Sequence, residues 1–106
     1  MDTTTDSKPQ VSSLQLPSTS TMQHAVKLAL SEDRPILLDY WSGSSDGSCF
    51  IGVRENDEKL LVKNEDEYTS PVGKIYAVEN DYIITTENSL YIVSKTISPI
   101  IYVKLK

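Results

Sequence analysis

The sequence predicts a mainly β protein with one N-terminal helix, folded as a small antiparallel barrel or a strongly curled meander sheet of six to seven strands. A Glu-Asn pair followed by Asp or Ser occurs at residues 55–57, 79–81 and 87–89, and each copy separates short runs rich in Val, Ile, Leu and Tyr. Asn and Asp favour tight reversals, so these sites predict hairpins between strands. Only one segment has helical periodicity, which disfavours a parallel sheet with helical crossovers.

The chain begins with a polar arm. Residues 1–21 hold five Thr, five Ser and two Pro, and their few apolar groups do not repay the entropy of ordering, so we predict a disordered arm. Val11, Leu14 and Leu16 are the exceptions, and they either dock on a partner or are inert. Residues 22–106 are then one small β-rich domain.

A capping helix is predicted at about residues 22–33. Ser20 or Thr21 can cap its first turn, and Pro35 prevents its continuation. Its expected stripe on the sheet is Met22, Ala25, Val26, Ala29 and Leu30.

The first three strands are expected at residues 36–41, 49–55 and 59–63. Tyr40 and Trp41 then point to opposite faces of the first strand, and the Ser/Gly-rich residues 42–48 form a mobile loop. A two-residue Asn56-Asp57 turn would set Val53 opposite Leu60 and Ile51 opposite Val62. A one-residue slip would put Ile51 against Lys63, so the apolar pattern favours the two-residue loop.

The remaining strands are expected at residues 73–79, 82–86 and 90–95, after an acidic loop or irregular edge at 64–71. A turn at Asn80-Asp81 sets Val78 opposite Ile83 and Ala77 opposite Ile84. At Asn88-Ser89 the pattern fits a two-residue and a three-residue loop equally. In the final strand, Ile101, Val103 and Leu105 alternate with polar or aromatic residues.

Charge and composition limit the partners and the compartment. The net charge of −5 works against binding nucleic acid, which requires a basic surface. No stretch reaches the ~18 apolar residues of a membrane span, and Met1-Asp2-Thr3 lacks the basic flank of a leader. The single Cys49 cannot form an internal disulfide, which agrees with a reducing compartment. We therefore expect an intracellular, cytoplasmic protein without membrane or nucleic-acid partners.

Catalytic and metal-binding groups are scarce. His24, the only histidine, is expected to be exposed at the helix start, and Cys49 has no basic neighbour in sequence to lower its pKa. One Cys and one His cannot supply a zinc site, and neither Asp46-Gly47 nor the acidic residues 65–67 match the ligand spacing of a calcium loop. We predict no enzymatic activity, no cofactor and no metal.

These observations favour a non-enzymatic protein-interaction or structural module whose partner is a protein or another copy of the chain. The alternative is a small-ligand-binding barrel whose mouth lies near residues 42–48. The candidate partner-binding residues combine an aromatic anchor with the acidic loops. They are Trp41, Asp46, Glu65, Asp66, Glu67 and Tyr68.

Two resemblances bear on these predictions. Residues 34–41 are similar to the segment that leads into the first central strand of thioredoxin-like proteins, but the redox Cys-x-x-Cys pair of that family is missing. Residues 25–93, with Leu38-Asp39-Tyr40-Trp41, Tyr68-Thr69-Ser70-Pro71 and the run from Thr86 to Val93, resemble short uncharacterised proteins of large DNA viruses. That resemblance implies no activity, and it implies a viral accessory protein or virion component.

Overall fold

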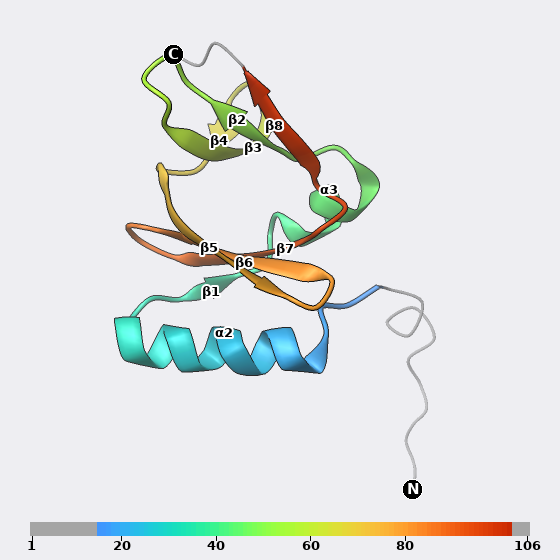
Figure 1. Ribbon diagram of the computed structural model, residues 1–106, viewed down its shortest axis with the longest axis vertical. Helices are drawn as coiled ribbons and strands as arrows, with labels where there is room; N and C mark the ends of the chain where they lie inside the picture. The colour runs from blue at the N-terminus through green and yellow to red at the C-terminus, as the bar shows by residue number, and fades with distance from the viewer. Residues whose placement is uncertain (1–14, 103–106) are drawn as a thin grey trace, which may run out of the picture.

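The computed structural model describes the backbone of residues 15–102 and the side chains of residues 15–97. Two sheets are stacked, and a long helix lies along the far side of one of them (Figure 1). The elements are α2 (Thr19–Glu32), β1 (Ile36–Leu37), α3 (Trp41–Asp46), β2 (Phe50–Val53), β3 (Lys59–Asn64), β4 (Glu67–Tyr68), β5 (Val72–Val78), β6 (Asp81–Thr86), β7 (Leu90–Ser94) and β8 (Ser98–Tyr102). The prediction of a mainly β fold with one principal helix is confirmed.

Each sheet has four strands. Sheet A has the order β1-β7-β6-β5, and sheet B has the order β4-β3-β2-β8. The predicted meander is present within sheet A, where β5, β6 and β7 follow one another antiparallel. No barrel closes among the described residues, and antiparallel pairing is not general, because β1 pairs parallel to β7 and β2 pairs parallel to β8. Residues 1–14 of the predicted arm and residues 103–106 of the predicted last strand lie outside the described part.

Helix α2 begins at Thr19, earlier than predicted. Its N-cap is Ser18, whose hydroxyl accepts the Thr21 N–H at 3.0 Å, whereas Ser20 and Thr21 lie inside the helix. The helix ends where Asp33 adopts a left-handed conformation and donates its N–H to the Ala29 carbonyl. Residues 19–21, which were assigned to the arm, therefore belong to the helix.

The buried face of α2 differs from the predicted stripe. Ala25 and Thr21 are buried and Met22 and Ala29 are partly buried, but Val26 is exposed. Leu30, also predicted to be buried, is 79% exposed. Small residues therefore face the sheet, and Val26 and Leu30 at the edge of the stripe are exposed to solvent.

The β2–β3 hairpin has a register different from the predicted one. Gly52 pairs with Leu60 and Ile51 with Leu61, and the Arg54 N–H donates to the Glu58 carbonyl at 2.9 Å. The loop therefore has three residues, the last of which, Asp57, is left-handed at φ 68°. The two-residue prediction is wrong because Leu60, Leu61 and Val62 are all buried, so the apolar pattern of this strand does not select one register.

The two hairpins of sheet A turn at Glu-Asn, one residue earlier than expected. Val78 pairs with Asp81 and Ala77 with Tyr82, so the loop is Glu79-Asn80 and the predicted pairs with Ile83 and Ile84 are wrong. Between β6 and β7 the loop has two residues, since the Thr86 N–H donates to the Ser89 carbonyl. The two-residue length predicted for the loop between β5 and β6 is confirmed, although its position is not.

Residues 42–48 do not form a mobile loop, and Tyr40 and Trp41 do not belong to the first strand. β1 ends at Leu37, and Trp41 starts the short helix α3. Ser44 anchors this helix to sheet A, because its hydroxyl donates to the Trp41 carbonyl at 2.6 Å and accepts the Ser94 N–H at 2.8 Å. The polar sequence that predicts a loop therefore supplies buried hydrogen bonds.

Sheet A separates two apolar clusters. One lies between the sheets and includes Cys49, Ile51, Leu61, Ile84 and Val93. The other lies between sheet A and α2 and is built from the residues Ala25, Trp41, Ile83, Leu90 and Ile92. Among the described residues, no helix is long and apolar enough to cross a membrane.

Candidate functional site at the free edge of β5

Strand β5 forms one edge of sheet A. Its seven residues make it the longest strand in the described part of the chain, and it pairs only with β6 there. The opposite edge of sheet A, β1, has only two residues. A long edge strand presents unpaired backbone groups that can pair with another chain, so the free edge of β5 is a candidate binding site.

The hydrogen bonds of Lys74 show which backbone groups of β5 face outward. The Lys74 N–H donates to Thr85 Oγ1 on β6 at 2.9 Å, and the Thr85 hydroxyl lies 3.5 Å from the Lys74 carbonyl. Because successive residues of a strand direct their N–H and C=O groups to alternate sides, Ile75 and Ala77 direct theirs away from β6. The free edge therefore offers two N–H donors and two C=O acceptors.

A bulge limits the regular part of this edge. Val72 pairs with Thr86 and Ile75 with Ile84, so both Gly73 and Lys74 stand opposite Thr85. The Thr85 hydroxyl fills the bulge, and a Cβ on Gly73 would lie 3.2 Å from it. Regular pairing with another strand is consequently restricted to the portion from Lys74 to Val78.

The side chains of β5 serve two faces. Tyr76 and Val78 are half-buried against the cluster beneath sheet A, next to α2. Ile75 and Ala77 lie on the opposite face, and Ile75 is 42% exposed. Tyr82, the partner of Ala77, is covered by the Lys95 ammonium at 5.6 Å from its ring centroid. An isolated exposed Ile on an edge strand adds apolar area to any strand that pairs there.

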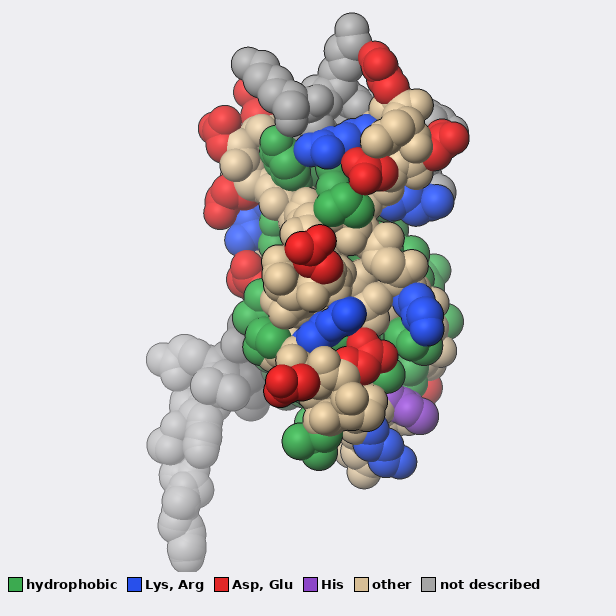
Figure 2. Space-filling view, turned by 90° about the vertical axis from the view of Figure 1, so that its left-hand side faces the viewer, with side chains coloured by type: hydrophobic (Ala, Val, Ile, Leu, Met, Phe, Trp, Pro, Cys, Tyr) green, Lys and Arg blue, Asp and Glu red, His purple; other side chains and the backbone are tan. Residues whose placement is uncertain are grey.

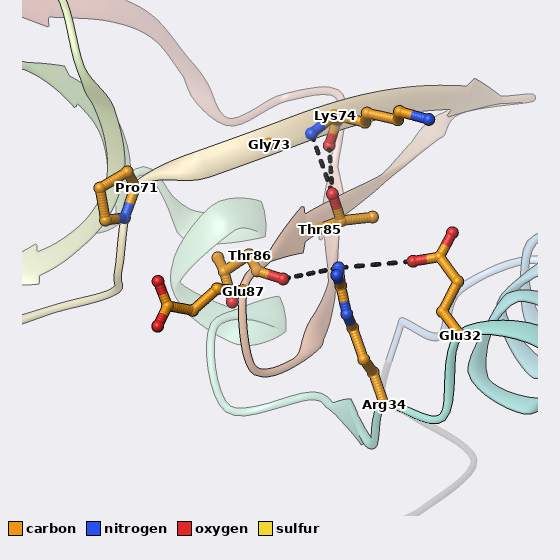
Figure 3. Close-up of a pocket in the computed structure, with 8 residues that line it drawn as sticks. All are labelled: Glu32, Arg34, Pro71, Gly73, Lys74, Thr85, Thr86 and Glu87. Carbon is orange, nitrogen blue, oxygen red and sulfur yellow. Dashed lines mark hydrogen bonds and ion pairs between the residues drawn. The ribbon is translucent and has the colours of Figure 1, made fainter.

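A shallow cleft of about 450 Å³ adjoins the start of β5 (Figure 3). Its walls come from the end of α2, the segment before β1, the bulge of β5 and the end of β6. The Arg34 guanidinium stands between Glu32 Oε1 at 3.4 Å and the Thr86 carbonyl at 2.7 Å. Lys74 and Glu87 add one charge of each sign. The cleft is therefore polar and close to neutral.

The face that looks out from the side of the cleft carries acidic and basic side chains mixed with hydrophobic ones (Figure 2). Acidic side chains outnumber basic ones on this face, but the two are interspersed. Binding there would accordingly depend on shape and backbone hydrogen bonds more than on long-range electrostatic attraction.

The predicted anchor Trp41 is buried and does not form an exposed binding surface. Only 8% of it is exposed, and its indole Nε1–H donates to the Gln15 carbonyl at 2.8 Å. Asp46 is exposed at the end of α3, where hydrogen bonds from the Ser48 hydroxyl and N–H hold the pKa of its carboxyl below its usual range. Asp46 thus serves a local turn, and Trp41 packs in a different layer of the molecule from the acidic loop.

The other predicted residues lie at the β3–β4 turn of sheet B. Glu65, Asp66 and Glu67 are exposed, and the Asn64 side chain accepts the N–H groups of the last two. Tyr68 is half-buried beneath the Arg54 guanidinium, which lies 5.7 Å from its ring centroid. These four form one acidic turn, but the structure does not bring them together with Trp41.

Cys49 lies in the core between the sheets. It is 1% exposed, and burial raises the pKa of its thiol, while Lys63 opposes the shift. His24 is exposed on α2. No group of three or more metal-ligating residues occurs in the part of the chain that the structure describes.

Neither the free edge of β5 nor the cleft was predicted from the sequence. Residues 73–79 were expected as a strand, but which strands lie at an edge depends on pairings such as β1 with β7 that leave no local signal. Arg34 and Lys74 are far apart in sequence and meet only through the fold. Two usable signals are present: Pro71 precedes the strand and Lys74 lies within it, and both residue types are typical of edges.

Comparisons of the chain with protein-family models, with curated proteins and with solved structures gave no match.

Proposed function

We propose that this protein is a non-enzymatic interaction module that binds an extended protein segment along the free edge of β5. The outward N–H and C=O groups of Ile75 and Ala77 carry the proposal. In β-augmentation, main-chain hydrogen bonds supply affinity, and pockets for alternate side chains supply specificity. The cleft beside Gly73 and Lys74 is placed to take one side chain of the incoming segment.

Backbone bonds alone do not make such a complex stable. Four hydrogen bonds contribute about 4 kcal/mol at roughly 1 kcal/mol each, whereas association costs about 4 kcal/mol or more. Side-chain contacts with Ile75 and in the cleft must supply the remainder. The proposal therefore favours segments with an apolar residue that reaches the exposed Ile75.

Random extended peptides displayed in a library provide the probe. Binders selected against the full chain should shift the amide resonances of Ile75 and Ala77, and they should lose about tenfold or more in affinity with Ala77→Pro. The Ala77 N–H faces outward, so proline there removes a donor to the ligand without removing one from sheet A. Leu30→Ser changes an exposed side chain of α2, so it is the control and should bind like the wild type.

If no selected peptide depends on Ala77, the proposed function is wrong. A peptide that binds wild type and Ala77→Pro equally, and shifts resonances elsewhere, would place binding on another surface.

The cleft favours a second candidate, a small polar ligand held by Arg34, Lys74 and Thr85. This candidate takes the place of the alternative at residues 42–48, of which residues 42–46 belong to α3. A metabolite screen by thermal shift, repeated with Arg34→Ala, distinguishes the candidates. A ligand that stabilises only the wild type supports the small-ligand candidate, and stabilisation by no compound removes it.

The viral resemblance fits within the proposal as context. A virion component or a viral factor that acts on a host protein would use an edge of this kind to hold its partner, inside the cell or in the particle.

A further inference from the structure

We infer that the segment bound by β5 is β5 of a second copy of this chain, paired antiparallel about Tyr76 to join two copies of sheet A into one eight-stranded sheet. This inference rests on the proposed function and names its partner. The geometry of the edge, its side chains and its charge each support it.

Symmetry restricts the possible registers. A two-fold axis perpendicular to the sheet keeps each face on its own side, so it must pass midway between the two copies of one residue, and Ile75, Tyr76 and Ala77 are the available centres. The outward backbone groups belong to Ile75 and Ala77. Centring on Tyr76 places Ile75 of each copy opposite Ala77 of the other, so all four N–H···O bonds form.

The other two centres form fewer bonds. Centring on Ile75 requires Gly73 to pair with Ala77, and the bulge opposite Thr85 disrupts that position. Centring on Ala77 requires Glu79 to pair with Ile75, but Glu79 lies in the turn with a left-handed φ of 51°. Each of these registers retains only the pair on the axis and loses half of the hydrogen bonds.

Side chains agree with the Tyr76 register. The exposed Ile75 meets Ala77 on one face, and the two Tyr76 rings meet on the other. Helix α2 packs chiefly against β1, β6 and β7, and its Thr21 hydroxyl also contacts the Val78 carbonyl of β5 at 3.4 Å. This arrangement pairs the exposed apolar side chains of β5 with each other and requires no other sequence.

Charge also agrees. Lys74 is the only charged residue of β5, and in this register it stands opposite Val78. The two Lys74 residues are separated by roughly 14 Å, well beyond the Debye length of about 8 Å at physiological salt. Glu79 of the second copy lies one residue beyond Val78, so a charge of opposite sign follows directly after the residue that faces Lys74.

The interface is small, which sets its expected strength. Pairing over five residues lies at the low end of specific interfaces, so the dimer should be weak and concentration-dependent. Sedimentation velocity of the full chain from about 10 to about 500 μM should show the shift from monomer to dimer. Ala77→Pro removes two of the four bonds and should weaken the dimer about 30-fold, whereas Leu30→Ser should leave it unchanged.

Disulfide trapping tests the register. The Tyr76 pair is a non-hydrogen-bonded pair with its Cα atoms about 4.5 Å apart, within disulfide range, so Tyr76→Cys should cross-link on mild oxidation. Ile75→Cys and Ala77→Cys are matched controls, because each would lie roughly 8 Å from its own copy and should cross-link at least tenfold more slowly. The wild type controls for the buried Cys49. Circular dichroism melts establish that each variant is folded.

A chain that stays monomeric at the highest concentration overturns the inference, as does a faster disulfide at Ile75 or Ala77. If the monomer still binds selected peptides in a manner that Ala77→Pro abolishes, only the identity of the partner is wrong. If it binds neither itself nor any peptide through β5, the proposed function fails as well.

Discussion

Gly43 of α3 lies so close to Cys49 that no room is left for a side chain at position 43. A Cβ on Gly43 would overlap Cys49 Sγ and lie 3.1 Å from Ser48 Oγ. At an open helical position alanine is favoured over glycine by about 1 kcal/mol. The sign of the effect at Gly43 therefore depends on whether steric overlap outweighs helix propensity.

We expect Gly43→Ala to destabilise the protein by about 1–3 kcal/mol, since overpacking of a rigid core exceeds the propensity gain. Urea denaturation measures the change. In a Cys49→Ala background the sulfur is gone, so the same substitution should cost much less. Equal losses in both backgrounds would show that the Cys49 thiol is not the obstacle.

The buried Cys49 also predicts a pH dependence. Burial raises the pKa of its thiol in the folded state, so the unfolded chain ionises first and stability falls as the pH rises above about 8.5. Cys49→Ala removes this loss. The stability of the Cys49→Ala variant should begin to fall only near pH 10. At that pH the tyrosines of the unfolded chain ionise, whereas burial raises the pKa of Tyr40 in the folded state. Denaturation at a series of pH values compares the two, and identical curves would contradict the assignment to Cys49.

At the scale of the element, Asp81 joins α2 to sheet A. Its buried carboxylate accepts the Ser18 N–H at 3.0 Å and the Thr21 hydroxyl at 2.7 Å. The first residue of β6 thus anchors the start of the helix. This explains why the turn before it falls at Glu79-Asn80 and Asp81 itself belongs to the strand.

Asp81→Ala should cost about 3 kcal/mol, because it leaves a backbone N–H and a hydroxyl without their charged acceptor. Hydrogen exchange should show faster opening at the first turn of α2 than elsewhere in the helix. Asp66→Ala, at an exposed turn, is the control and should change stability by less than about 0.5 kcal/mol. Equal protection of both helix ends in Asp81→Ala would argue against the anchor.

Hairpins were predictable and their registers were not. Asn and Asp mark reversals through local chemistry, and all three reversals lie within one residue of where the sequence places them. Register depends on which face is buried, and Leu60, Leu61 and Val62 are buried on both faces of β3. Because buried and exposed residues do not alternate along β3, the pairing of β2 with β3 is selected by the three-residue loop and its left-handed Asp57.

For the whole molecule, the cluster between the sheets couples the two halves. Leu61 of sheet B packs there with Ile84 and Val93 of sheet A. Lys63 reinforces the junction, since its ammonium lies 4.9 Å from the Tyr40 ring centroid and 3.9 Å from Asp39 Oδ2. The two sheets should therefore unfold together.

Leu61→Ala should cost about 2–5 kcal/mol through lost burial and a residual cavity. The loss should appear in the exchange of both sheets and in a single melting transition. Lys63→Ala, which removes only the partly exposed contacts, should cost under about 1 kcal/mol. A two-step melt in which sheet A retains wild-type stability would show that the halves fold independently.

The candidate site could not be predicted from the sequence because it, too, depends on the whole fold. A free edge is a property of the assembled sheet, and it follows from the parallel pairs β1–β7 and β2–β8, which join distant segments. The acidic turn at residues 65–67 was found because its composition is local. Arg34 and Lys74, at the cleft, become neighbours only after folding.

Trp41, the only tryptophan of the chain, provides an optical probe of the region before α2. Its indole N–H is bound to the Gln15 carbonyl while its ring packs under sheet A. Release of residues 15–18 ahead of the helix would expose this nitrogen to water and shift the emission to the red, with the sheets still folded. Fluorescence can thus follow detachment of the N-terminal segment separately from unfolding, without an added label.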